Sequence, residues 1–222
     1  MKVIRRFTPC DGREVRVDER DGAAPKINGY AAVFYDGTPA TEYRYYDVVE
    51  RIMPGAFSFA LPKSDVRGLF NHDPNFVLGR NKAGTLVLTV DAVGLRYVID
   101  PPKSSIGNDV LESLRRRDVT GSSFAFTVDK KGQTWTRGED GNYVREIISV
   151  AELFDVGPVT YPAYTATEAV ARSMGEPENL DEFKAAARAA AGAAVDAGNA
   201  EALRAAHIRA GELRRMALTD LL

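Results

Sequence analysis

The sequence predicts a mainly β domain with a few short helices (α+β), followed by an alanine-rich helical tail. Short runs rich in β-branched and aromatic residues recur before residue 174, and glycine and proline separate them. Beyond residue 174 alanine dominates and these breaks nearly vanish. We therefore expect a domain over residues 1–173 and a tail over residues 174–222. Strands at such short intervals, with brief helices between them, favour a closed or nearly closed β-barrel decorated by helices.

Strands are predicted where aromatic and β-branched residues cluster between turn-forming residues. The expected strand ranges are 30–34, 45–52, 66–72, 85–90, 95–99, 122–128, 143–150 and 153–160. A hairpin turn is expected at Asp91-Ala92-Val93-Gly94, between two of these ranges. A second hairpin, rich in glycine and in charged residues, is expected around Trp135.

Two short helical segments complete the predicted domain. Pro54-Gly55 opens an apolar segment over residues 56–61, for which we expect one or two helical turns. Ser105 is placed to cap a helix over residues 106–117. The apolar residues of this helix that share one face are Ile106, Val110, Leu111 and Leu114.

The tail contains two predicted helices. Asn179, with Glu182 three residues later, resembles a capping box that opens a helix through about Ala197. Gly198-Asn199 breaks it, and a second helix follows with a weakly apolar stripe at three-four spacing. The stripe comprises Leu203, Ala206, Ala210, Leu213 and Ala217. A helical hairpin, a self-association element and a partly disordered tether all remain open for this tail.

Composition and charge narrow the possible partners. Of the 222 residues, 45% are hydrophobic and 27% are charged, which is typical of a soluble globular protein. The formal net charge of -2 gives no electrostatic reason to expect nucleic acid as a partner. No apolar stretch approaches the roughly 20 residues that span a bilayer, and residues 1–6 contain no apolar signal-peptide core. We therefore expect an intracellular protein with neither a nucleic-acid nor a membrane partner.

Cysteine and histidine are scarce, which limits metal and redox chemistry. Cys10 is the only cysteine, so an internal disulfide is excluded and a reducing compartment is favoured. His72 and His207 are the only histidines, which leaves little material for a transition-metal site. We expect neither a metal nor a cofactor. A cysteine hydrolase that uses Cys10 stays as a minor alternative, because this residue lies in a turn-like segment near the N-terminus.

His72 and Ser123 are candidates for a catalytic base and its nucleophile. His72 ends the predicted strand 66–72, where a fixed backbone leaves the ring open to a cleft. Ser123 lies among small residues, and a serine hydroxyl needs an adjacent base to become nucleophilic. From the residues alone, a surface histidine in a turn and a turn serine entering a strand remain open. The α/β-hydrolase elbow is not supported, because position 125 is alanine.

Asp155 interrupts an otherwise apolar run that is predicted to form a buried strand. A carboxylate in such a place costs several kcal/mol unless it is paired or hydrogen-bonded. An imidazole is one suitable partner, and orienting a histidine is the role of the third member of a catalytic triad. Glu152 is the neighbouring candidate for that role. Strand alternation places the two carboxylates on opposite faces, so only one of them is expected to face the site.

Several segments, in their order and spacing, resemble phage prohead maturation proteases. The upstream segments are 29–34 (GYAAVF), 50–57 (ERIMPGAF), 70–73 (FNHD) and 78–80 (LGR). The downstream segments are 94–95 (GL), 115–119 (RRRDV), 122–126 (SSFAF) and 155–164 (DVGPVTYPAY). The resemblance runs from about residue 29 to residue 167 and leaves the tail outside.

This resemblance implies a fold similar to that of herpesvirus assembly proteases, a β-barrel ringed by short helices. It also implies a serine nucleophile with a histidine base. Carried over by position, the nucleophile is Ser123, the base is His72 and the third member is Asp155.

The sequence departs from the family pattern at several places near these residues. Ser122 stands where a larger apolar residue is commoner, which makes it a rival nucleophile. Ala125 replaces a usual glycine, and Gly157 replaces a usual serine. Asp155 is shorter than the more frequent glutamate, so the third role stays open between Asp155 and Glu152.

The resulting functional hypothesis is a serine endopeptidase that cleaves scaffold or capsid-protein segments during prohead maturation, and also cleaves itself. Its expected substrates are the major capsid protein or a scaffold protein, and self-association is expected. Its expected location is the host cytoplasm, inside the assembling prohead. The alternative is a non-enzymatic capsid-assembly adaptor or scaffold-like protein that uses a β-barrel and a helical tail.

Overall fold

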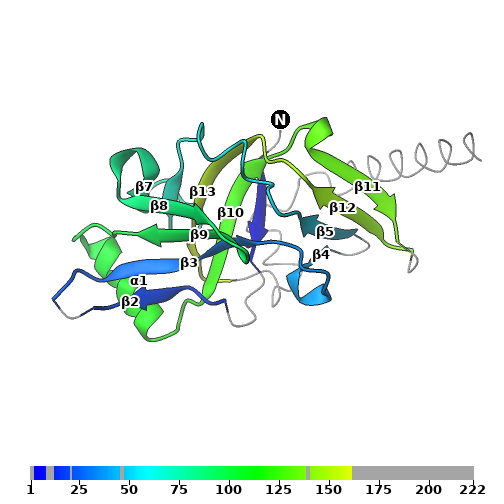
Figure 1. The fold of residues 1–222 in the computed structure, drawn as a ribbon. Coiled ribbons are helices and arrows are strands. Elements are labelled where there is room, and N and C mark those ends of the chain that lie inside the picture. The colour runs from blue at the N-terminus through cyan, green and yellow to red at the C-terminus, as the bar shows by residue number, and fades with distance from the viewer. Residues whose placement is uncertain (1–2, 9–12, 21, 46–47, 139–140, 162–222) are drawn as a thin grey trace, which may run out of the picture.

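The computed structural model describes residues 3–8, 13–20, 22–45, 48–138 and 141–161, and Figure 1 shows how their elements are arranged. These residues are mainly β, with one α-helix, which confirms the predicted β-rich class at that level. The predicted tail, with its two helices, lies outside the described residues. No helix in the described part of the chain is long and apolar enough to cross a membrane.

A sheet of five strands forms the centre of the domain and carries the candidate site. Its order is β1 (Ile4–Phe7), β10 (Gly121–Thr127), β13 (Glu152–Val159), β6 (Arg67–Leu69) and β7 (Val77–Arg80). All neighbours are antiparallel except β13 and β6, which run parallel. In Figure 1 the short β1 lies beside β10, in agreement with this order.

Two sheets of four strands flank the central one. One has the order β11 (Gln133–Arg137), β12 (Tyr143–Ile147), β5 (Val48–Ile52) and β4 (Tyr43–Tyr45). The other has the order β2 (Arg16–Asp18), β3 (Lys26–Val33), β9 (Gly94–Ile99) and β8 (Leu86–Val90). The helical elements are α1 (Ser105–Arg115), η1 (Pro39–Thr41), η2 (Asn81–Ala83) and η3 (Lys130–Gly132).

The expected closed barrel is not found among the described residues. Closure requires every strand to pair on both sides, whereas each of the three sheets ends in two strands that have one ladder neighbour. The expected ring of helices is reduced to α1 and three short 3-10 segments. Residues 54–63, which include the segment 56–61 expected to be helical, form consecutive turns, and Gly55 at their start has a left-handed φ of 87°. The correct description is an open, three-sheet β domain.

The apolar core lies against the inner face of β10. Phe124 and Phe126 stack there with ring centroids 4.8 Å apart, and Phe57 meets Phe124 edge-on at 5.9 Å. All three rings are fully buried. Because side chains alternate along a strand, Ser123 and Ala125 point to the opposite face of β10. The core therefore fixes the strand that presents the candidate nucleophile.

A buried ion cluster joins β1 to the sheet that contains β5. Arg6 of β1 donates from Nε and Nη2 to the Glu50 carboxylate at 2.7 and 3.0 Å. Arg145 of β12 donates to the same carboxylate at 2.6 Å. Burial acts to raise the pKa of Glu50, but the charges of Arg6 and Arg145 outweigh it, so that pKa lies below its usual value. Glu50 is therefore ionised and ties two sheets together.

We expect Glu50→Gln to lower the free energy of unfolding by about 3–5 kcal/mol, because two buried arginines lose their counter-charge. Urea denaturation at neutral pH measures this difference. Because the pKa of Glu50 is lowered, its stabilisation is present above the pKa of an unfolded glutamate and is lost as the pH falls through the folded pKa. The difference in the free energy of unfolding between the wild type and Glu50→Gln should therefore become smaller in acid.

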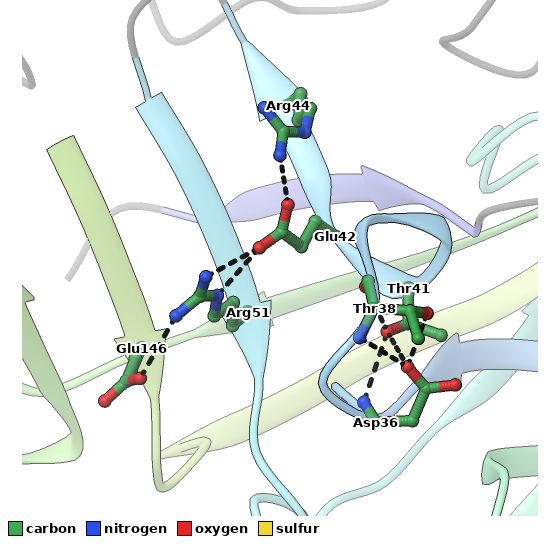
Figure 2. Close-up of polar contacts among 7 residues, drawn as sticks. All are labelled: Asp36, Thr38, Thr41, Glu42, Arg44, Arg51 and Glu146. Carbon is green, nitrogen blue, oxygen red and sulfur yellow. Dashed lines mark hydrogen bonds and ion pairs between the residues drawn. The ribbon is translucent and has the colours of Figure 1, made fainter. Parts of the chain in front are cut away.

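Glu42 provides the matched control. Its carboxylate also bridges two arginines, Arg44 at 2.5 Å and Arg51 at 2.8 and 2.9 Å, as Figure 2 shows. These arginine side chains are 48% and 25% exposed, against 9% and 4% for Arg6 and Arg145. Water can solvate the released charges, so Glu42→Gln should cost less. An equal loss of unfolding free energy in Glu50→Gln and Glu42→Gln would show that burial of the arginines does not determine this loss.

Candidate active site

The end of β6 and the facing part of β13 approach each other very closely. A Cβ atom on Gly157 would lie 2.0 Å from the carbonyl oxygen of Leu69, so only glycine fits at this point of β13. The proteases that the sequence resembles usually have serine at this position, whereas the backbone of this chain leaves no room for a side chain there. The close approach brings the segment after β6 over the face of β10 that carries Ser123.

A tight turn after β6 holds His72. Asn71 and His72 have left-handed φ values of 55° and 58°, a conformation that asparagine tolerates and that costs other residues about 1–3 kcal/mol. The Asn71 backbone N–H donates to the Pro158 carbonyl at 3.1 Å. Its side chain accepts from the Thr160 N–H at 2.8 Å and donates to the Thr160 hydroxyl at 3.0 Å. His72 therefore lies in a turn that hydrogen bonds to β13 and Thr160 hold in place. The prediction that residue 72 ends a strand is wrong, because β6 ends at Leu69.

Ser123 lies on β10 with its hydroxyl directed at the imidazole of His72. The distance from Ser123 Oγ to His72 Nε2 is 2.5 Å. The same hydroxyl lies 2.9 Å from the carbonyl oxygen of Arg6 on β1, to which it can donate. A serine hydroxyl has one proton, so it donates to only one of these two acceptors at a time. Ser123 is fully buried.

Asp155 lies on β13 at the other side of the imidazole ring. Its Oδ1 is 2.5 Å from His72 Nδ1, and the residue is buried. This contact gives the carboxylate the partner that its apolar surroundings require. When Asp155 accepts the Nδ1 proton, Nε2 is left as the acceptor that faces Ser123. The structure thus brings all three residues predicted from the sequence into one hydrogen-bonded chain.

The rival residues lie elsewhere or outside the described residues. Ser122 points away from His72, and its hydroxyl pairs with the Tyr97 hydroxyl at 2.8 Å in the interior. Cys10 and His207 lie outside the described residues. No group of three or more metal-ligating side chains occurs in the described part of the chain.

A β-bulge changes the expected relation between Glu152 and Asp155. Ala125 pairs with Asp155, whereas Phe126 pairs with Leu153, so β13 contains one extra residue at this point. The extra residue breaks the strict alternation of side chains. Both carboxylates therefore line one cavity, of about 340 Å³, and the expectation of opposite faces is wrong.

Sequence reasoning missed the contribution of β1. Its register places Phe7 opposite Ser123, and the Phe7 ring meets the His72 ring edge-on at a centroid distance of 6.4 Å. The Arg6 carbonyl adds the second acceptor for the Ser123 hydroxyl. A four-residue strand with two charged residues has no clear periodic signal, so only the tertiary pairing reveals this role.

Comparison with protein families matches residues 13–179 to the family of the caudovirus prohead serine protease. The chain belongs to this family. The region matched to the prohead protease family contains the turn with His72, all of β10 and all of β13, whereas β1 precedes it. Neither the comparison with curated proteins nor that with solved structures gave a match.

Proposed function

We propose that this protein is a serine endopeptidase that cleaves scaffold or capsid-protein segments during prohead maturation and also cleaves itself. The observation that supports this proposal most is the continuous chain of contacts from Ser123 through His72 to Asp155. Serine, histidine and aspartate in this order form the constellation that activates a serine hydroxyl on several unrelated folds. Membership of the prohead protease family supports the same reaction.

The proposed reaction begins when His72 Nε2 takes the proton of Ser123 and Oγ attacks the scissile carbonyl carbon. Asp155 holds the Nδ1–H of the ring and stabilises the imidazolium that forms. The tetrahedral intermediate collapses when His72 gives its proton to the leaving amine, which leaves an acyl group on Ser123. Water, deprotonated by the same ring, then hydrolyses the acyl-enzyme. Backbone N–H groups would stabilise both oxyanions.

The proposed setting is the assembling prohead in the host cytoplasm, with the major capsid protein or a scaffold protein as substrate. Residues 1–173 would form the protease domain. Residues 174–222 would serve docking, self-association or self-removal, as their weakly apolar helical pattern suggests. This division assigns catalysis to the β domain and delivery to the tail.

Incubation with the neighbouring capsid and scaffold proteins, followed by mass spectrometry of the fragments, tests the proposed function. A fluorophosphonate probe provides a second, substrate-independent readout, because it labels an activated serine. We expect defined fragments and a label on Ser123. Intact partner proteins together with an unlabelled Ser123 would favour the non-enzymatic assembly adaptor.

The proposed reaction requires His72 Nε2 to accept the proton of Ser123. His72→Ala should be inactive and folded, as measured by peptide cleavage and circular dichroism. His207→Ala is the control and should cleave as the wild type does. If His207→Ala were the inactive variant, the site would have to be placed elsewhere.

A further inference from the structure

A cavity of about 340 Å³ opens beside Asp155, next to the proposed catalytic chain. Its lining combines apolar residues with charged residues: Leu69, Pro74, Val77, Phe154, Asp65, Arg67, Glu152 and Asp155. A volume of this size lies at the lower end of the range for small-ligand sites and suits one amino-acid side chain. The proposed reaction, as described above, does not use this cavity.

The apolar part of the cavity suits an aliphatic chain. Val77 on β7 is 43% exposed, and Pro74 in the preceding loop is exposed as well. Phe154, the extra residue of the bulge, is only partly buried. Long basic side chains bury their methylene stems on such surfaces and keep the charged end in a polar place.

The basic groups around the cavity are already engaged. Arg67 donates to the Asp65 backbone carbonyl at 2.6 Å and pairs with the Asp65 carboxylate at 3.2 Å. Arg80 donates twice to the same carboxylate, at 2.8 and 2.6 Å. The Arg80 hydrogen bonds hold the pKa of Asp65 below its usual value, so this carboxylate is ionised. Both arginines thus already pair with Asp65.

Among the described residues, Glu152 supplies an unpaired negative charge to the cavity lining. It lies at the exposed start of β13, and within the described ranges no side chain pairs with its carboxylate. The remaining carboxylate of the cavity, Asp155, is bound to His72. The described lining of the cavity contains three carboxylates and one guanidinium, so its charge is negative, which favours a cation over an anion.

The cavity also lies at a suitable distance from the nucleophile. Asp155 borders the cavity and is separated from Ser123 by the width of one imidazole ring. An extended peptide advances about 3.3 Å per residue. A substrate bound at Ser123 would therefore present to the cavity a side chain roughly two to four residues from the scissile bond.

We propose that this cavity is a substrate subsite for a lysine or arginine side chain, with Glu152 as the residue that determines this specificity. The stem lies on Val77 and Phe154, and the charged end pairs with Glu152. The inference rests on the proposed protease function and adds the class of substrate residue that the site selects.

The test is cleavage of a peptide library prepared by digestion of a proteome after glutamate, which leaves lysine and arginine inside the peptides. New termini are mapped by mass spectrometry for the wild type, Glu152→Gln, Glu152→Lys and the control Glu112→Gln. Glu112 is an exposed glutamate on α1, away from the cavity lining. Circular dichroism of each variant verifies the fold.

We expect the wild type and Glu112→Gln to enrich lysine and arginine at one position within about four residues of the cleaved bond. Glu152→Gln should reduce this enrichment roughly three- to tenfold while cleavage of other peptides continues. Glu152→Lys should enrich aspartate, the acidic residue that this library retains inside its peptides, at the same position. Wild-type cleavage without a basic preference, or an unchanged preference in Glu152→Gln, would overturn the inference. Complete loss of cleavage in folded Glu152→Gln would also overturn it, whereas no cleavage by the wild type would instead refute the protease function.

Discussion

Ser123→Ala is expected to lose roughly a million-fold in turnover, the loss typical of removing a triad serine. The reason is that no other described hydroxyl lies within hydrogen-bonding distance of His72 Nε2. The measurement is single-turnover cleavage of a peptide taken from a mapped fragment end, together with fluorophosphonate labelling. Because Ser123 is small and its methyl replacement fits the same buried position, the variant should remain folded.

Ser122→Ala is the matched control for this experiment. It removes a neighbouring hydroxyl from the same strand, but that hydroxyl pairs with Tyr97 on the interior side of β10. Most of the activity should remain, with a modest loss of stability because the buried Tyr97 hydroxyl loses one partner. Wild-type-like cleavage by Ser123→Ala, or a dead Ser122→Ala, would reverse the assignment of the nucleophile.

Asp155→Asn is expected to lower turnover roughly ten-thousand-fold, as in other triads whose orienting carboxylate becomes an amide. The amide nitrogen can donate to His72 Nδ1, which favours the tautomer with its proton on Nε2. That tautomer cannot accept the proton of Ser123. Turnover on the same peptide measures the loss, and thermal unfolding should show little change, because the amide has the shape of the carboxylate.

Glu152→Gln distinguishes a catalytic carboxylate from a specificity-determining one. On peptides without a basic residue near the cleaved bond, its turnover should fall about tenfold or less, because the two ring nitrogens of His72 contact Asp155 and Ser123. A larger loss of turnover in Glu152→Gln than in Asp155→Asn would assign the role of orienting His72 to Glu152 instead of Asp155. Such a result would leave Ser123 and His72 in place.

The strands with the strongest local pattern were predictable from the sequence. Residues 95–99, 122–128 and 153–160 match β9, β10 and β13 within a residue or two at each end. The helix predicted over residues 106–117 matches α1 to within two residues at each end, but the predicted cap is wrong: Ser105 is the first helical residue and Ser104 is the N-cap. The predicted range 45–52 contains the last residue of β4 and all of β5, two strands that pair antiparallel with each other.

The missed elements are short and depend on tertiary pairing. β1, β2 and β7 have four residues or fewer, which is too short for a periodic signal. The parallel pairing of β13 with β6 joins segments that are distant in sequence, and no local pattern encodes it. The bulge at Phe154, which changes the direction of the side chains before it, was missed for the same reason. It arises from the register between β13 and β10, which no local pattern encodes.

The candidate site required the resemblance as well as the residues. The sequence separations are 51 residues from His72 to Ser123 and 83 residues from His72 to Asp155, so spacing alone gives no geometry. Local reasoning placed His72 at the end of a strand, whereas the turn around Asn71 holds it. The buried carboxylate at Asp155 was the strongest signal in the residues themselves, because its desolvation demanded a partner.

The Ser123 hydroxyl lies between two acceptors, His72 Nε2 and the Arg6 carbonyl, and can donate its proton in either of two directions. When His72 Nε2 carries a proton, it donates to Oγ, and the serine proton turns to the Arg6 carbonyl 2.9 Å away. When Nε2 carries no proton, it becomes a second acceptor, and the hydroxyl can turn toward it. The direction of the Ser123 O–H bond thus follows the proton on Nε2 without any movement of the backbone. Glu50 holds Arg6 in the interior, so the carbonyl that accepts from Ser123 is fixed in place by the first described strand, β1.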